Sequence, residues 1–235
     1  KEATGLKLNS IEVHDIMCMV GEIVVVGGVR RSALISLSNL TDKRMREAKT
    51  GAWYDQNPHR GLANNSVAYT EHPDSETFME EWLSLVKSKS GERGIFNRVA
   101  AQNQANKWGR RDPTLSYGTN PCSEIILRDK QFCNLTEVVV REKDTEATLL
   151  NKVRLATILG TIQSTLTNFK FLSSEWEHNT EEERLLGVSL TGIMDCKVTS
   201  NPDPKLLERL RDEARKQIRS IQEYLEYSPQ PVSLV

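Results

Sequence analysis

Apolar residues recur at helical spacing in several segments of the chain and alternate or cluster in others. This pattern predicts helices over residues 10–26, 41–49, 74–90, 98–108 and 150–169, and a last helix that begins at Asp203-Pro204. It predicts strands over residues 29–37, 66–70, 94–96 and 132–141. Residues 51–61 and 109–130 contain Gly and Pro without periodicity and are predicted loops. Strands that alternate with helices predict an α/β fold.

Four of these helices carry an apolar stripe that we expect to face a core. The first helix is predicted to begin with Asn9 and Glu12 as a capping pair and to end at Gly27-Gly28. The four stripes are, in chain order, Val13, Ile16, Met17, Val20 and Val24; Phe78, Met79, Trp82, Leu85 and Val86; Leu155, Leu159, Ile162, Leu166 and Phe169; and Leu207, Leu210, Ala214, Ile218, Ile221 and Leu225.

Composition indicates an ordinary globular protein. The 235 residues are 38% hydrophobic and 27% charged, with a formal net charge of −1. The balanced charge argues against a nucleic-acid scaffold or a protein of anionic membrane surfaces. The longest apolar stretch, residues 16–29, contains Glu22 and is too short to span a bilayer. The first residues show no signal peptide, so we expect a cytoplasmic protein without nucleic-acid or membrane partners.

The four cysteines are Cys18, Cys122, Cys133 and Cys196. None forms a Cys-x-x-Cys pair and no His lies at ligand spacing from them, so no metal site is expected. Four cysteines in a chain of this length do not resemble a secreted disulfide scaffold. Cys18 and Cys196 are interpreted as small buried residues.

Candidate chemistry is concentrated between Asn120 and Cys133. Pro121 restricts Asn120 to an extended conformation. In an extended segment Asn120, Cys122 and Glu124 would point the same way, so that an amide, a thiol and a carboxylate converge. On spacing alone, a loop with a turn Asn, a buried Cys and a solvated Glu is an equally good interpretation.

The surrounding motifs resemble those of one enzyme family. The stretch Gly118-Thr119-Asn120-Pro121-Cys122-Ser123-Glu124-Ile125, followed by Phe132-Cys133-Asn134-Leu135, resembles the active-site signature of ribonucleotide reductases, and the adenosylcobalamin-dependent class most closely. Three further segments are similar to other blocks of that family, in the same order: Gly27-Gly28-Val29-Arg30-Arg31-Ser32-Ala33, Asn64-Asn65-Ser66-Val67 and Leu186-Gly187-Val188-Ser189-Leu190-Thr191-Gly192.

The resemblance implies a role for each site residue. Cys122 would carry the thiyl radical that abstracts the 3′ hydrogen of the ribose, and Glu124 would be the general base on the 3′ hydroxyl. Asn120 would hydrogen-bond the substrate hydroxyls. Cys133 would be one of two cysteines that supply electrons by forming a disulfide, its partner lying outside this chain. Pro121 and, from the other block, Asn65 and Ser66 would also bind substrate.

The resemblance also implies a cofactor and partners. Cys122 and Cys133 are 133 − 122 = 11 positions apart, a short spacing similar to that of the cobalamin-dependent enzymes. Adenosylcobalamin is therefore the expected radical source, and a separate di-iron subunit is the alternative. The expected substrate is a ribonucleoside di- or triphosphate, and the expected reductant is of the thioredoxin type.

The family's catalytic domain is a ten-stranded α/β barrel with the radical cysteine on a central loop. Residues 1–235 are expected to form part of such a barrel, without its first strands and its phosphate-binding end, and to be inactive alone. One alternative is a non-catalytic fragment that completes a split barrel with a companion chain. Another is a thiol oxidoreductase that uses Cys122 and Cys133, although low-pKa redox pairs usually form Cys-x-x-Cys at a helix N-terminus.

Overall fold

The computed structural model describes residues 5–26, 29–30, 32–89, 91–107, 109 and 111–224. Contacts divide the chain into two compact units, residues 1–129 (unit 1) and residues 130–235 (unit 2), and each is described by itself. The mixture of helices with small, mostly parallel sheets confirms the α/β class. The barrel, and one barrel domain over residues 1–235, stay predictions.

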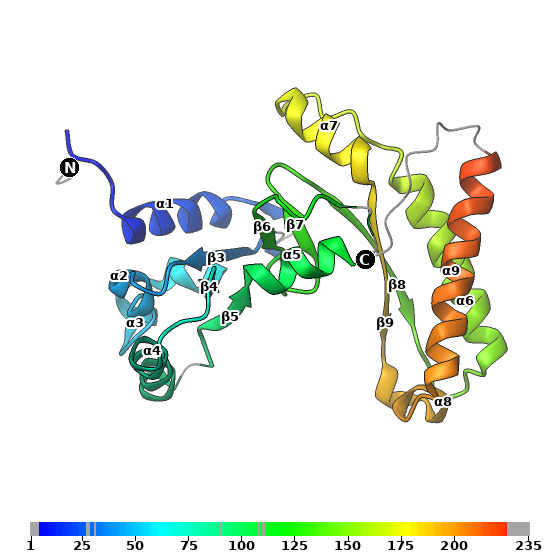
Figure 1. The fold of residues 1–235 in the computed structure, drawn as a ribbon, viewed down its shortest axis with the longest axis horizontal. Helices are drawn as coiled ribbons and strands as arrows, with labels where there is room; N and C mark the ends of the chain where they lie inside the picture. Colours follow the sequence, from blue (N-terminus) through cyan, green and yellow to red (C-terminus); the bar gives the residue numbers. More distant parts are fainter. Residues whose placement is uncertain are drawn as a thin grey trace. The chain divides into compact units, whose positions relative to one another are not determined.

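Unit 1 is built on a three-stranded parallel sheet (Figure 1). Its strands, in spatial order, are β3 (Leu34–Ser38), β4 (Ala63–Tyr69) and β5 (Gly94–Asn97). Parallel neighbours need long connections, and here these contain helices. The connecting helices are α2 (Lys43–Arg46), α3 (Trp53–Gln56), the 3-10 helix η1 (Pro58–Leu62) and α4 (Ser75–Ser88). The prediction of a loop over residues 51–61 is therefore wrong, because Pro58 opens a helical turn there.

Helix α1 (Ser10–Glu22) begins as predicted, with a reciprocal capping box. The Glu12 backbone N–H donates to Asn9 Oδ1 at 3.1 Å, and the Asn9 N–H donates to Glu12 Oε2 at 2.7 Å. The helix ends before residue 26, and an antiparallel pair follows, β1 (Val25–Val26) and β2 (Val29–Arg30). The predicted stop at Gly27-Gly28 lies outside the described residues.

Three of the four predicted apolar stripes do not face a core within their own unit. In α1 the buried residues are His14, Cys18 and Gly21, whereas the stripe from Val13 to Val24 is about half exposed. In α4 the buried residue is Glu81, whose carboxylate accepts hydrogen bonds from Arg93 and Arg46. Two guanidinium groups offset the desolvation of this carboxylate, so the charged face of α4 faces inward.

Residues 109–130 contain a β-hairpin, although a loop was predicted. Helix α5 (Arg98–Asn106) precedes β6 (Tyr117–Thr119), which pairs antiparallel with β7 (Ile126–Arg128). Strands of three residues are too short to show a period of two. Buried Tyr117 anchors the hairpin against α5.

Unit 2 contains a two-stranded parallel sheet of long strands. Strand β8 (Cys133–Val139) pairs along its whole length with β9 (Leu185–Thr191). The helices of this unit are α6 (Glu146–Gln163), α7 (Ser174–Glu183), the 3-10 helix η2 (Ile193–Asp195), α8 (Lys197–Ser200) and α9 (Pro204–Tyr224).

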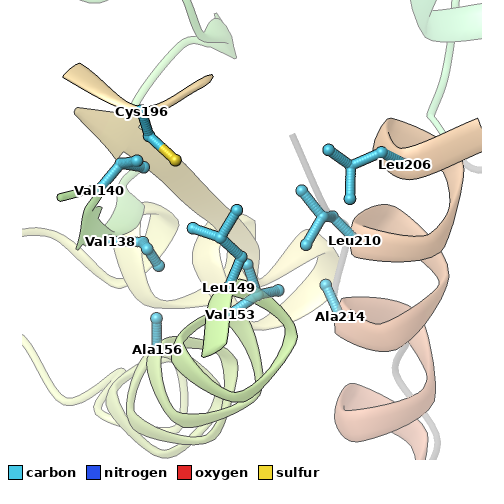
Figure 2. Close-up of a cluster of buried hydrophobic side chains, with 9 residues drawn as sticks. All are labelled: Val138, Val140, Leu149, Val153, Ala156, Cys196, Leu206, Leu210 and Ala214. Carbon is cyan, nitrogen blue, oxygen red and sulfur yellow. The ribbon is translucent and has the colours of Figure 1, made fainter. Parts of the chain in front are cut away.

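The core of unit 2 lies where α6 and α9 pack together on the sheet (Figure 2). Its residues come from these helices, from β8 and its end, and from the segment before α8: Val138, Val140, Leu149, Val153, Ala156, Cys196, Leu206, Leu210 and Ala214. The predicted α9 stripe is confirmed at Leu210, Ala214 and Ile218, but Leu207 is exposed and Leu206 is buried in its place. Leu225 lies outside the described residues. The predicted α6 stripe is largely exposed, because Gly160, on the opposite side, lets the helix lie against Leu186. Within the described parts of the chain, no helix is long and apolar enough to cross a bilayer.

Candidate active site

The hairpin of unit 1 presents Cys122 to solvent. Strands β6 and β7 pair up to Thr119 and Ile126, and the Cys122 loop (residues 120–125) joins them. Both Cys122 and Glu124 are exposed in this loop. Cys122 therefore lies in a loop, as predicted, although a hairpin and not an irregular segment carries this loop.

The Cys122 loop is closed by a tight turn. The Ser123 N–H donates to the Asn120 carbonyl at 3.0 Å, and the Asn120 N–H donates to the Ile125 carbonyl at 3.3 Å. Ser123 has a φ of 66°, in the left-handed region. The prediction of an extended segment, in which Asn120, Cys122 and Glu124 point the same way, is therefore wrong. Asn at the first and Pro at the second position are typical of a β-turn, which is the signal that alternation missed.

The side chain of Asn120 has a structural and a free end. Its Oδ1 accepts from the Ile125 N–H at 3.0 Å and from the Thr119 hydroxyl at 3.3 Å. Among the described residues, its Nδ2 has no hydrogen-bond partner. Asn120 can therefore donate to a ligand oxygen while its carbonyl end is held by the loop.

Asn64 was not singled out from the sequence, yet it contacts the Cys122 loop directly. Its Nδ2 donates to the Pro121 carbonyl at 2.7 Å. Asn64 is the exposed position of β4, between buried Ala63 and Asn65. Adjacent residues of a strand face opposite ways, so Asn64 and Asn65 could have been predicted to contact different parts of the molecule.

Asn65 and Ser66 lie in the interior of unit 1. Asn65 is 4% exposed, and its Oδ1 lies 3.1 Å from His14 Nε2. Its backbone N–H donates to Glu92 Oε2 at 3.3 Å. For the described residues, no hydrogen bond joins Asn65 or Ser66 to the Cys122 loop, and substrate binding by this pair stays a prediction.

A polar cluster surrounds His14 and Cys18. Arg60 donates twice to Asp15, at 2.7 Å each. Burial alone would raise the pKa of Asp15, but hydrogen bonds from Arg60 and His14 outweigh it and lower this pKa to about 2. Cys18 is fully buried 3.8 Å from His14 Nδ1, and burial raises the pKa of its thiol. The interpretation of Cys18 as a buried residue is confirmed, and its environment disfavours a reactive thiolate.

Cys133 begins β8 in unit 2, as predicted, and is half-buried. Its thiol donates to the Asn134 carbonyl at 3.4 Å. The preceding Phe132 packs against Phe169 and Trp176, with ring centroids 4.7 and 4.8 Å away. This aromatic cluster fixes the point at which the chain enters β8.

Comparison with known proteins gives a consistent result, although no protein-family model matches the chain. The chain is 30% identical over 81% of its length to a protein of Lacticaseibacillus paracasei, of which it covers 25%. It is 26% identical over 100% of its length to one of Lactobacillus helveticus, covering 31% of it. It is also 29% identical over 83% of its length to one of Lactobacillus leichmannii, covering 26%. All three are adenosylcobalamin-dependent ribonucleoside-triphosphate reductases.

The resemblance seen in the motifs is confirmed: this chain is a relative of the ribonucleotide reductases, and it spans between a quarter and a third of the length of the relatives it matches.

Proposed function

We propose that this chain provides the radical-bearing thiol of a ribonucleotide reductase, which makes deoxyribonucleotides as DNA precursors. The observation that carries the proposal is the Cys122 loop itself. It offers an exposed thiol, an exposed carboxylate two residues on, and a free amide donor on Asn120. These groups suit hydrogen-atom abstraction and proton transfer on a ribose.

Each residue of the loop has one task in this proposal. The Cys122 sulfur, as a thiyl radical, takes the hydrogen atom from C3′ and returns it at the end of the cycle. Glu124 accepts the proton of the 3′ hydroxyl, a contribution worth roughly 10²–10⁴ in rate. Asn120 Nδ2 donates to a ribose hydroxyl oxygen, and the bond from Ile125 to its Oδ1 holds the amide in orientation.

Cys133 and a second cysteine outside this chain supply the electrons. Their two thiols become one disulfide, the C2′–O bond breaks, the oxygen leaves as water, and C2′ gains a hydrogen. The ribonucleotide is reduced by two electrons, and a thioredoxin-type protein reduces the disulfide afterwards. Neither Cys18 nor Cys196 suits the second position, because both are buried in cores.

The proposed radical source is adenosylcobalamin, which supplies a radical by homolysis of its carbon–cobalt bond. The exposure of the Cys122 thiol fits oxidation by a group that approaches from outside the hairpin. We assign the corrin ring to no residues of this chain. The proposed substrate is a ribonucleoside triphosphate, the proposed setting is a ten-stranded barrel in the cytoplasm, and a diphosphate substrate and a di-iron radical subunit are the alternatives.

The test uses the chain together with the polypeptides that accompany it in its own cell. This mixture, the native preparation, is supplied with adenosylcobalamin, a dithiol and each ribonucleoside triphosphate. Deoxyribonucleotides are then measured by chromatography. We expect product, and we expect Cys122→Ser to abolish it. Cys196→Ser is the control, since Cys196 lies in the core of unit 2 and has no part in the proposed chemistry. Undiminished product with Cys122→Ser, or no product from any nucleotide, would refute the proposal.

The second candidate is a non-catalytic fragment that completes a reductase barrel with a companion chain. The observation in its favour is that the apolar stripes of α1, α4 and α6 are exposed, and exposed apolar patches are typical of surfaces that bind another protein. A cavity of about 560 Å³ adjoins α1 along β3. The discriminating measurement is hydrogen exchange of α1 and α6 in the native preparation and in the purified chain. Protection that appears only in a complex whose activity survives Cys122→Ser would favour this candidate.

A further inference from the structure

We propose that Asn64 is a positioning residue for Cys122, acting through the Pro121 carbonyl. This inference rests on the proposed function, since it concerns the residue that would carry the radical. The hydrogen bond of 2.7 Å from Asn64 Nδ2 to the Pro121 oxygen is its starting point.

The Cys122 loop is closed at its base but has few restraints at its tip. The bonds between Asn120, Ser123 and Ile125 close the base. Pro121 has no N–H to donate, and Cys122 stands in the middle of the turn. Within the described residues, Asn64 makes the one hydrogen bond that reaches residues 120–125 from outside the hairpin. The Asn64 side chain therefore holds the tip of the loop in place relative to β4.

The anchor is placed on the best-held strand of unit 1. Strand β4 is the central strand of its sheet, with β3 on one side and β5 on the other. Asn64 pairs in register with Ile35, and its two neighbours along the strand are buried. A side chain that projects from such a strand has little backbone freedom of its own.

The bond acts on the peptide unit that contains Cys122. A peptide unit is planar, so the Pro121 carbonyl, the Cys122 nitrogen and the Cys122 Cα move together. Holding the carbonyl oxygen therefore fixes where the Cys122 side chain leaves the backbone. Misplacement of a reacting group by about 1 Å can cost about 10²-fold in rate.

The structure specifies a donor at this position and not simply a side chain of the right size. Asp has the shape of Asn but only acceptor oxygens, so Asn64→Asp would place a carboxylate against a carbonyl oxygen. Asn64→Gln keeps the donor on a longer stem, which an exposed position can accommodate. Asn103→Ala is the matched control, because Asn103 is an exposed amide on α5 of the same unit.

The first experiment measures the order of Cys122 in the 235-residue chain labelled with ¹⁵N-cysteine. Cys122→Ser identifies the Cys122 amide signal, and the signal of buried Cys18 reports whether unit 1 is folded. We expect an order parameter of about 0.85 in the wild-type chain and below about 0.6 in Asn64→Asp. Asn64→Gln and Asn103→Ala should stay near the wild-type value. An unchanged Cys122 order parameter in folded Asn64→Asp would overturn the proposal.

A second measurement decides the matter if Asn64→Asp unfolds. In a trans peptide the carbonyl oxygen and the next Cα lie on the same side. A nuclear Overhauser contact between the Asn64 side-chain amide protons and the Cys122 α proton is then expected in the unsubstituted chain. Its absence would overturn the proposal without any variant.

Activity separates positioning from simple structural support. In the native preparation, Asn64→Asp should lower kcat about 10- to 100-fold and change KM less than about twofold, with Asn64→Gln recovering most of the rate. Wild-type kcat in Asn64→Asp would overturn the positioning role. If the preparation makes no deoxyribonucleotide, the proposed function fails, whereas the order parameters still decide whether Asn64 anchors the loop.

Discussion

His14 Nε2 lies 3.1 Å from Asn65 Oδ1, and this buried contact joins α1 to the central strand β4. It gives Asn65 a structural task that the motif alone did not indicate. Asn65→Ala removes the contact from the His14 ring and should cost about 1–3 kcal/mol of the stability of unit 1. The measurement is urea unfolding followed by the reactivity of the buried Cys18 thiol. Asn103→Ala, at an exposed site, should stay within about 0.5 kcal/mol of wild type. Unchanged stability in Asn65→Ala would show that the contact with His14 does not stabilise unit 1.

The two cysteines of the proposed mechanism should fail in different ways in the native preparation. Cys122→Ala should abolish exchange of tritium from the substrate 3′ position under every reducing condition, since no other group takes that hydrogen. Cys133→Ala should still permit exchange but not sustained turnover, because the reducing thiol is missing. Equal loss of exchange in both variants would contradict these roles.

The 235-residue chain by itself should show no reductase activity. Ribose reduction needs two thiols within bonding distance of each other, and disulfide geometry is strict. Cys133 is half-buried at a strand start, but Cys18 and Cys196 are enclosed in the cores of their units. The assay contains the chain, adenosylcobalamin, dithiol and each ribonucleotide, with the native preparation as the positive control. Deoxyribonucleotide above background from the chain alone would mean that another residue completes the site.

The Asp15 cluster should make unit 1 less stable in acid. The folded-state pKa of Asp15, about 2, lies below its ordinary value of 3.8. The corresponding stabilisation is present above about pH 4 and is lost as the pH falls toward 2, and it amounts to about 2 kcal/mol. Urea unfolding between pH 2 and pH 4.5, followed at Cys18 with 4,4′-dithiodipyridine, should show a smaller change in stability for Asp15→Asn than for wild type. If the stabilities of Asp15→Asn and wild type change equally with pH, Asp15 is not a cause of the acid sensitivity.

Gly192 should be the least replaceable glycine of unit 2. Its φ is 74°, and a Cβ would lie 2.6 Å from the Val140 carbonyl oxygen. Gly192→Ala therefore adds a backbone clash to left-handed strain and should destabilise unit 2 by about 2–4 kcal/mol. Gly51, in unit 1, also has a positive φ but no atom near its Cβ position, so Gly51→Ala should cost about 1 kcal/mol. The reactivity of the Cys196 thiol in urea reports the unfolding of unit 2, and that of the Cys18 thiol reports the unfolding of unit 1. Equal losses of stability in Gly192→Ala and Gly51→Ala would rule out a clash with the Val140 carbonyl.

The sequence predicted most helices and long strands of this chain but not which helical face is buried. Periodicity selects an apolar stripe, yet α4 buries Glu81 because Arg46 and Arg93 neutralise it, a pairing of distant residues that no local pattern reveals. Likewise α1 buries His14 because Asn65, 51 positions away, meets its ring.

Prediction of the site was better for position than for orientation. The motif located Cys122 in a loop and Cys133 at a strand start, both as observed. Alternation failed for Asn120 because Asn followed by Pro begins a turn, in which the carbonyl and the side chain of Asn120 accept hydrogen bonds from Ser123 and Ile125. The contact of Asn64 joins segments 57 residues apart, so its partner could not be read from spacing.

The consecutive asparagines of β4 make the length of the preceding segment critical. Asn64 faces the Cys122 loop and Asn65 faces His14, and strand pairing fixes this choice through the register of Asn64 with Ile35. Deleting one residue from η1, directly before β4, would pull the strand by one position and reverse both side chains at once. Such a deletion would break the interior contact and the loop anchor together, although no asparagine had been replaced. Natural variation in this protein should therefore tolerate substitutions within η1 far better than insertions or deletions there.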